Sequence, residues 1–125
     1  MTIKILAVED NEVTGKFLSS ILTEKGYQVK VLQDGLGVVE EAKNFDPHLI
    51  LMDILLPDID GAEAVKLLQR DPRTADIPVI FLSALVEEDH QGSNTISVND
   101  RDYLALSKSI TTDEFLKTLN KVLKK

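Results

Sequence analysis

An apolar run that ends in a single carboxylate constrains this chain more than any other stretch. Residues 49–52 read Leu-Ile-Leu-Met, Asp53 follows directly, and Pro57 and Gly61 then interrupt the chain. An apolar run without polar alternation predicts a strand buried on both faces, and the proline and glycine predict a loop after it. In open α/β sheets, the carboxyl edge where such an acid emerges is the edge that binds ligands. Taken alone, Asp53 would serve equally well as a turn residue.

The rest of the chain alternates between strand and helix patterns. In the first helical pattern, Val13, Phe17, Leu18, Ile21 and Leu22 share one face. The alternation predicts an α/β fold with a five-stranded parallel sheet and right-handed crossovers, in the doubly wound, flavodoxin-like order 2-1-3-4-5. Strands are expected at residues 3–8, 27–31, 49–52, 77–82 and 103–106, and helices from residue 12 to Gly26, at 37–45, at 62–70 and from Thr111 to the last residues.

Polar residues follow the predicted strands, and in a parallel sheet these strand ends lie together. Glu9 and Asp10 follow the first strand, Asp53 the third, Ser83 the fourth and Lys108 the fifth. Clustered carboxylates repel one another unless a cation lies among them or one of them stays protonated, and oxygen ligands suit Mg²⁺. A lysine and a hydroxyl beside such a cluster are the groups needed to hold a phosphoryl group. Asp53 is then a candidate nucleophile that forms an acyl phosphate.

This set of residues resembles the receiver domain of the response-regulator family, of the single-domain type found among chemotaxis regulators. The resemblance rests on the acidic pair at residues 9–10, on Asp53 with Pro57 and Gly61 at fixed distances after it, on the Ser-Ala pair at residues 83–84, and on Lys108. It covers nearly the whole chain, so residues 1–125 are expected to form one receiver domain.

The resemblance implies a role for each residue of the predicted metal and phosphorylation site. Asp53 is expected to be the phosphoacceptor. Asp10, Asp53 and the backbone carbonyl of Leu55 are expected to ligate Mg²⁺ directly, and Glu9 to act on the metal through water. Ser83 and Lys108 are expected to contact the phosphoryl group.

The resemblance also implies partners and an output. The phosphoryl donor would be a sensor histidine kinase or a histidine phosphotransfer protein of a two-component system or phosphorelay. The activated chain would then modulate a downstream protein. The domain would catalyse only its own phosphorylation and dephosphorylation, so it is expected to be a signalling switch and not an enzyme.

Three features depart from the family pattern. Ser109 follows Lys108 where receivers usually have proline, which leaves open whether the Lys108–Ser109 peptide bond is cis or trans. Ala105 occupies the position of the usual switch aromatic, and Tyr103 is more simply a packed strand residue. The segment between Ser83 and Lys108 lacks a regular amphipathic helix. The missing proline and the missing switch aromatic argue for the alternative of a pseudo-receiver, a constitutive interaction module without phosphoryl chemistry. The complete set of Asp10, Asp53, Ser83 and Lys108 argues against it.

The segment at residues 86–102 instead predicts a β-hairpin. Residues 95–98 alternate and are mostly β-branched, and residues 99–102 are turn-like. We expect residues 95–98 to form an extra strand antiparallel to the last strand, at the edge of the sheet. The helix that receivers usually have here would be reduced to about one turn near residues 86–90, or lost. The exposed edge would suit homodimerisation or strand pairing with a partner.

Composition excludes several other functions. The net charge of −7 argues against nucleic-acid binding, and the absence of cysteine excludes thiolate chemistry. No apolar run reaches the length of a membrane span and no signal peptide is recognisable, so the expected location is cytoplasmic. A flavin phosphate would meet acidic residues in the turn at residues 9–14, which argues against a flavodoxin-like cofactor protein.

A few polar residues outside the predicted site are expected to be structural. His48 and His90 have no partner at ligand spacing, so surface positions are expected for both. Asp58 and Asp60 lie in the loop after Asp53, where aspartate usually bonds to nearby backbone.

Overall fold

The computed structural model describes residues 2–83 and 94–123. The predicted and observed boundaries differ by at most two residues, and the predicted strand at 49–52 is reproduced. In chain order the elements are β1 (Lys4–Val8), α1 (Glu12–Glu24), β2 (Gln28–Leu32), α2 (Val38–Phe45), β3 (Leu49–Met52), α3 (Gly61–Arg70), β4 (Val79–Ser83), β5 (Asn94–Val98), β6 (Arg101–Ser107) and α4 (Thr112–Leu123).

The strands form one six-stranded sheet in the order β2-β1-β3-β4-β6-β5. Every neighbouring pair is parallel except β5 and β6, which are antiparallel. The parallel part has the predicted order 2-1-3-4-5, because β6 is the fifth parallel strand. The doubly wound, flavodoxin-like prediction is therefore confirmed, and the additional strand is the one expected from residues 95–98.

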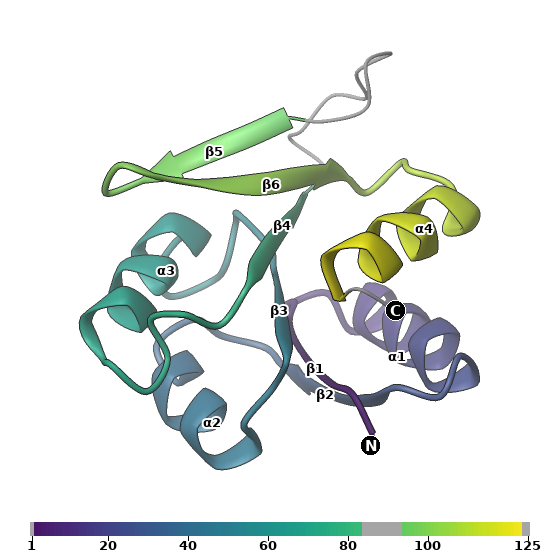
Figure 1. Ribbon diagram of the computed structural model, residues 1–125, viewed down its shortest axis with the longest axis horizontal. Coiled ribbons are helices and arrows are strands. Elements are labelled where there is room, and N and C mark those ends of the chain that lie inside the picture. The colour runs from purple at the N-terminus through teal and green to yellow at the C-terminus, as the bar shows by residue number, and fades with distance from the viewer. Residues whose placement is uncertain (1, 84–93, 124–125) are drawn as a thin grey trace.

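Helices cover both faces of the sheet, as Figure 1 shows, with α1 and α4 on one face and α2 and α3 on the other. Two separate apolar clusters fill these layers. The central strands supply side chains to both clusters, since every residue of β3 and β4 is buried. This burial on both faces is the physical reason why the run at residues 49–52 shows no polar alternation.

Helix α1 begins where the sequence offers a capping residue, but its apolar face is only partly buried. The Asn11 side chain accepts a hydrogen bond from the Thr14 backbone N–H at 3.0 Å, so Asn11 caps the helix and the neighbouring Asp10 does not. The predicted apolar face is only partly correct. Leu18 and Leu22 are buried, but Val13 and Phe17 remain 78% and 57% exposed. The periodicity identified the helix, but it did not show that the apolar side chains of its first two turns would remain largely exposed.

The predicted hairpin is confirmed. Residues Asn94–Val98 pair with β6 from Val98 opposite Arg101 to Asn94 opposite Ala105. The connecting residues Asn99 and Asp100 both have positive φ, of 52° and 64°. Positive φ at both central residues defines a type I′ turn, whose twist matches that of the strands it joins. The short helical turn expected at residues 86–90 lies outside the described residues, as does His90.

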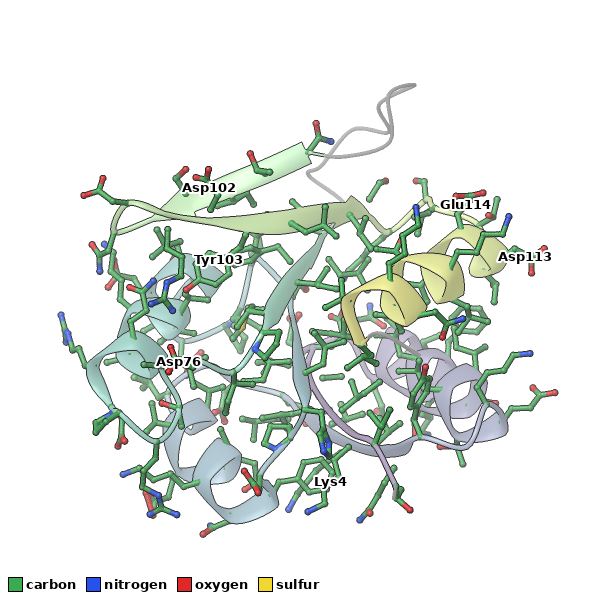
Figure 2. All side chains as sticks on the ribbon, viewed as in Figure 1. Lys4, Asp76, Asp102, Tyr103, Asp113 and Glu114 are labelled. Carbon is green, nitrogen blue, oxygen red and sulfur yellow. The ribbon has the colours of Figure 1, made fainter. Side chains whose placement is uncertain are left out.

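Tyr103 packs the hairpin against α3. Figure 2 shows Asp102 and Tyr103 on opposite sides of β6, with Tyr103 on the side of α3. The Tyr103 ring meets Phe81 edge to face at a centroid distance of 6.0 Å, and its hydroxyl accepts a hydrogen bond from Gln69 Nε2 at 2.8 Å. Gln69 also donates to the Val98 carbonyl. Tyr103 is therefore a packed strand residue, as the sequence indicated.

His48 is half-buried and does not have the expected surface position. Its Nδ1 accepts a hydrogen bond from the Lys4 backbone N–H at 3.0 Å, which ties the start of β3 to the start of β1. Sequence spacing gave no sign of this contact because the two residues are far apart in the chain. Among the described residues, no helix has the length and apolar character needed to cross a membrane.

Candidate phosphorylation and metal site

Three carboxylates meet at the carboxyl edge of the sheet. Glu9 and Asp10 follow β1, Asp53 follows β3, and one oxygen atom from each lies within 4.8 Å of the other two. Glu9 and Asp53 are buried, at 3% and 6% exposure, and Asp10 is exposed. The strands β1 and β3 are adjacent in the sheet, with Val8 opposite Met52, so the residues that follow them emerge side by side.

Lys108 reaches this cluster from the loop after β6. Its Nζ lies 2.5 Å from Glu9 Oε1 and 3.1 Å from Asp53 Oδ2. Burial alone would lower the pKa of Lys108, but the hydrogen bonds and charges of Glu9 and Asp53 outweigh that effect and hold its pKa above the ordinary value. Lys108 therefore remains a cation at neutral pH.

The donor set fits a hard divalent cation. Three carboxylates and one ammonium group leave two negative charges at this edge, which a divalent cation would balance. All the side-chain donors are oxygens, and Mg²⁺ prefers oxygen ligands while keeping several waters. The exposed Asp10 and the buried Asp53 offer a cation one solvent-facing and one interior ligand. Both carboxylate oxygens of Glu9 already have a partner in the protein: Oε1 contacts Lys108, and Oε2 accepts a hydrogen bond from the Asn11 backbone N–H.

Ser83 lies at the end of β4, next to the strand that carries Lys108. It is buried, at 1% exposure, and its backbone carbonyl accepts a hydrogen bond from the Lys108 backbone N–H at 3.1 Å. Leu55, two residues after Asp53, has a side chain that is 58% exposed. The sequence-predicted residues thus all lie at the same sheet edge, with Lys108 in direct contact with two of the carboxylates.

A serine turn takes the place of the usual proline after Lys108. No peptide bond between described residues is cis, so the Lys108–Ser109 bond is trans. The Ser109 backbone N–H donates to Ser107 Oγ at 3.0 Å, and the Ile110 N–H donates to the Ser107 carbonyl at 3.1 Å. These local bonds hold the loop that presents Lys108. Ser107 was not among the residues predicted for the site, although the Ser-Lys-Ser tripeptide is a signal for a serine turn.

Gly61 closes the loop that follows Asp53. Its backbone N–H donates to the Ile54 carbonyl at 2.7 Å, and a Cβ placed on it would lie 2.3 Å from the Asp53 carbonyl oxygen. No side chain fits at that distance, so only glycine allows α3 to start so close to the phosphoacceptor candidate.

Asp58 makes a contact with the β2–α2 loop that was not predicted from the sequence. Its two carboxylate oxygens accept hydrogen bonds from the backbone N–H groups of Gly35 and Leu36, at 2.9 and 2.7 Å. The expectation of purely local bonding is therefore wrong for Asp58, which joins the β3–α3 loop to the β2–α2 loop. The Gly35 hydrogen bond is the main reason why the pKa of Asp58 lies below its ordinary value, and the Leu36 bond adds to it. Asp60 bonds locally as expected, capping α3 through the Glu63 N–H.

Fold and site together define a protein of two-component signalling. The sequence pattern of the response regulator receiver domain matches residues 5–120. The chain belongs to this family, whose members are signalling domains and not enzymes in the ordinary sense. It is 32% identical to the polar-differentiation response regulator DivK of Brucella ovis over 98% of both chains. It is 33% identical to the DNA-binding dual master transcriptional regulator RpaA of Synechocystis, over 98% of this chain but only about half (49%) of the length of that relative.

Solved structures give the same family. The receiver domain of a Pseudomonas aeruginosa sensor histidine kinase, which has magnesium coordinated in its active-site cleft, superposes with a TM-score of 0.81 at 27% identity over 100% of both chains. The chemotaxis protein CheY4 of Vibrio cholerae superposes with a TM-score of 0.82 at 25% identity, over 98% of this chain and 99% of that one.

Proposed function

We propose that this chain is a phosphorylation-activated signalling switch. Asp53 accepts a phosphoryl group from a sensor histidine kinase or a histidine phosphotransfer protein, with Mg²⁺ as cofactor, and the activated chain then modulates a partner protein. The observation that carries the proposal is the contact of Lys108 Nζ with both Glu9 and Asp53 inside a cluster of three carboxylates. An ammonium group and a metal-binding set around one buried carboxylate are the groups that phosphoryl transfer requires.

The transfer step is a displacement at phosphorus. A carboxylate oxygen of Asp53 attacks the phosphorus atom of a phosphohistidine, the P–N bond breaks, and the leaving imidazole nitrogen keeps the electron pair and later takes a proton. When bound, Mg²⁺ would supply positive charge that offsets the negative charge of the phosphoryl oxygens. Asp10, Asp53 and the Leu55 carbonyl are its proposed direct ligands, and Glu9 acts through water.

Lys108 and Ser83 have distinct proposed roles toward the phosphoryl group. Lys108 exchanges part of its pairing with Asp53 for a phosphoryl oxygen, which keeps its positive charge partnered in both states. Ser83 donates its hydroxyl to another phosphoryl oxygen. Because the Ser83 carbonyl and the Lys108 N–H are hydrogen-bonded to each other, both residues respond to the modification together.

Exposed apolar side chains around the site suit a protein as the phosphoryl donor. Among the described residues, the large apolar side chains that remain exposed are Val13, Phe17, Leu36 and Leu55. They belong to the segments that follow β1, β2 and β3, at the same edge as Asp53. Phe17 and Lys108 also line one small groove between α1 and α4. Apolar groups clustered around a charged centre are typical of protein–protein contact surfaces.

The test is labelling with a small phosphoryl donor. Incubation with acetyl phosphate and Mg²⁺ should give a mass gain of one phosphoryl group that is stable in acid and labile in base. Asp53→Asn should abolish this gain, because an amide is not a nucleophile toward phosphorus. Asp60→Asn is the matched control, since asparagine also caps helices and this acid lies outside the carboxylate cluster. Stoichiometric labelling that persists in Asp53→Asn would contradict the assignment.

The same experiment separates the switch from the pseudo-receiver. The serine in place of proline after Lys108 and the alanine at the usual switch position are the features that argue for a module without phosphoryl chemistry, against the complete set of site residues. If the native chain is not labelled at all but still binds a partner protein, the chain is a pseudo-receiver and not a phosphorylation switch.

A further inference from the structure

In the described part of the chain, nothing covers the outer edge of the strand β5, and the strand lacks the residues that usually protect such an edge. Within residues 2–83 and 94–123, β5 has a single neighbouring strand, β6, and Figure 1 shows it at the outer margin of the sheet. Its sequence, Asn-Thr-Ile-Ser-Val, contains no charged residue and no proline. Natural proteins usually block sheet edges with lysine, proline or a bulge, because the unpaired backbone groups recruit further strands. The opposite edge follows this rule, since β2 carries Lys30, paired with Glu41.

The turn geometry identifies which backbone groups of β5 point outward. A two-residue type I′ turn is closed between its first and fourth residues, so Val98 and Arg101, which lie opposite each other, are expected to be a hydrogen-bonded pair. In an antiparallel pair, residues that bond to the partner strand alternate with residues that do not. Thr95 and Ser97 therefore direct their N–H and C=O groups to the free edge. The Ser97 hydroxyl bonds to the Asp102 carboxylate, which agrees with the closer side-chain approach of a non-hydrogen-bonded pair.

The outward groups of β5 match a second copy of the same strand. When two β5 strands run antiparallel about a two-fold axis at Ile96, Thr95 of one copy faces Ser97 of the other, and the reverse. Each Thr–Ser pair then exchanges both of its backbone hydrogen bonds. The Thr95 hydroxyl lies beside Ser97, whose oxygen can still accept a hydrogen bond while its hydrogen is donated to Asp102. No charged residue of β5 opposes another. Each chain carries a net charge of −7, and a strand without charged residues adds no like-charge pair of its own to the contact.

We propose that two copies of this chain associate by antiparallel pairing of their β5 strands about a two-fold axis at Ile96, so that the two sheets become continuous. The association is that of the unphosphorylated chain, so its test does not require that Asp53 accept a phosphoryl group. A strand of five residues buries less surface than a standard stable interface, so the dimer is weak and dissociates on dilution.

The first test measures association of the full chain by sedimentation velocity over a concentration series up to about 1 mM, a range suited to weak interfaces. The native chain should show a reversible monomer–dimer equilibrium. Thr95→Lys should raise the dissociation constant by about tenfold or more, because it places a cation at the pairing edge. Gln28→Lys, the same charge change in the exposed edge strand β2, should leave the equilibrium unchanged.

Thr95→Pro provides a second disruption that does not rely on charge. It removes an N–H that points away from β6, so the β5–β6 hydrogen bonds remain and the variant should fold. Far-ultraviolet circular dichroism checks the fold independently of association. This variant should be monomeric at concentrations where the native chain is dimeric.

The second test reads the register through introduced cysteines, since the native chain has none. Ile96→Cys should form an intermolecular disulfide, because facing residues of a non-hydrogen-bonded pair have Cα atoms about 4.5 Å apart, within disulfide range. Ile96 packs partly against the core, so a second design uses the exposed neighbours. A mixture of Thr95→Cys and Ser97→Cys chains should form a mixed disulfide faster than either chain forms a disulfide with itself.

Several outcomes would overturn the proposal. The first is a chain that stays monomeric throughout the series. If the Thr95 and Ser97 amides of that monomer are also protected from hydrogen exchange, the edge is covered within one chain. The second is a dimer that Thr95→Lys and Thr95→Pro leave intact. A dimer whose cysteine pairs form in another register would equally exclude the arrangement.

Discussion

At the scale of single residues, the site depends on how its charges are compensated. Glu9 and Asp53 are buried carboxylates, which are costly without partners, and Lys108 contacts both. Asp10 is exposed and lies in the same cluster without a described ion pair to Lys108. Asp10 is therefore the carboxylate whose charge is least compensated in the metal-free chain, and it should respond most to an added cation.

We predict that Mg²⁺ stabilises the native chain and that Asp10→Asn removes most of the effect. At about ten times its dissociation constant, a ligand that binds only the folded state adds about 1.4 kcal/mol to the free energy of unfolding. For a chain of this size, that raises the melting temperature by about 4–6 °C. Differential scanning calorimetry with and without Mg²⁺ measures the shift. Asp76→Asn, an exposed acid after α3, should keep the full shift, and a native chain insensitive to Mg²⁺ would argue against a metal site here.

Gly61→Ala should damage both stability and labelling. The added Cβ would lie 2.3 Å from the Asp53 carbonyl oxygen, so the loop must move away from Asp53. Overpacking of this kind costs about 1–3 kcal/mol. Gly26→Ala is the control, because Gly26 has φ of +91° and no atom near its Cβ position, so alanine there is strained by about 1–2 kcal/mol away from the site. Chemical denaturation should show both variants destabilised, but only Gly61→Ala should slow acetyl phosphate labelling. Equal labelling rates would mean that Gly61 does not position Asp53.

At the scale of elements, hydrogen bonds from a side chain to the backbone connect the β3–α3 loop with the β2–α2 loop. Asp58, in the β3–α3 loop, accepts the N–H groups of Gly35 and Leu36 in the β2–α2 loop. Gly35 is packed so tightly that a Cβ there would lie 2.8 Å from the Ile59 side chain. The β3–α3 loop also contains Leu55, whose carbonyl is a proposed metal ligand. Asp58 is therefore placed to hold that loop in position.

Asp58→Asn should weaken the fold at neutral pH. Asparagine has one side-chain acceptor oxygen, so it can keep only one of the two hydrogen bonds. The pKa of Asp58 is lowered in the folded chain from its ordinary value of 3.8. Its contribution to stability is therefore present above that value and is lost as the pH falls through the lower folded pKa.

The measurement is the melting temperature of native chain and Asp58→Asn from neutral to strongly acid pH. The difference should be constant at neutral pH and should shrink as the pH falls below 3.8. Asp60→Asn carries the same charge change two residues away and keeps its helix cap, so it should melt like the native chain. A difference between native chain and Asp58→Asn that is independent of pH would rule out the carboxylate as its source.

At the scale of the whole molecule, the hairpin connects the site to a distant edge of the sheet. The strand β6 ends at Ser107, directly before Lys108, and pairs with β4, which carries Ser83 at its end. The other side of β6 pairs with β5, and Tyr103 and Gln69 fix the hairpin to α3. A displacement of Lys108 or Ser83 toward a phosphoryl group acts directly on the strand that supports the hairpin.

We predict that amide hydrogen exchange in residues 95–106 changes when beryllofluoride and Mg²⁺ are added to mimic phosphorylation. The proposed movements of Ser83 and Lys108 alter the end of β6, which pairs with β5. A second connection runs through α3, which starts at Gly61 beside Asp53 and bonds to Val98 through Gln69. Exchange measured by mass spectrometry on the native chain gives the readout, with Asp53→Asn as the control that should not respond. Changes confined to other segments would mean that the hairpin is not the output surface.

The sequence by itself determined most of the elements and the members of the candidate site. Helix periodicity, strand patterns and turn residues act over a few neighbouring positions, so the run ending at Asp53 and the β-branched stretch before Asn99 were sufficient to predict β3 and the hairpin. Only the tertiary structure decided which distant groups meet. Asp58 bonds to Gly35, His48 to Lys4, and Lys108 to Glu9 as well as Asp53. These contacts depend on how the loops and helices pack against the sheet. Local sequence preferences act over a few residues and do not determine that packing.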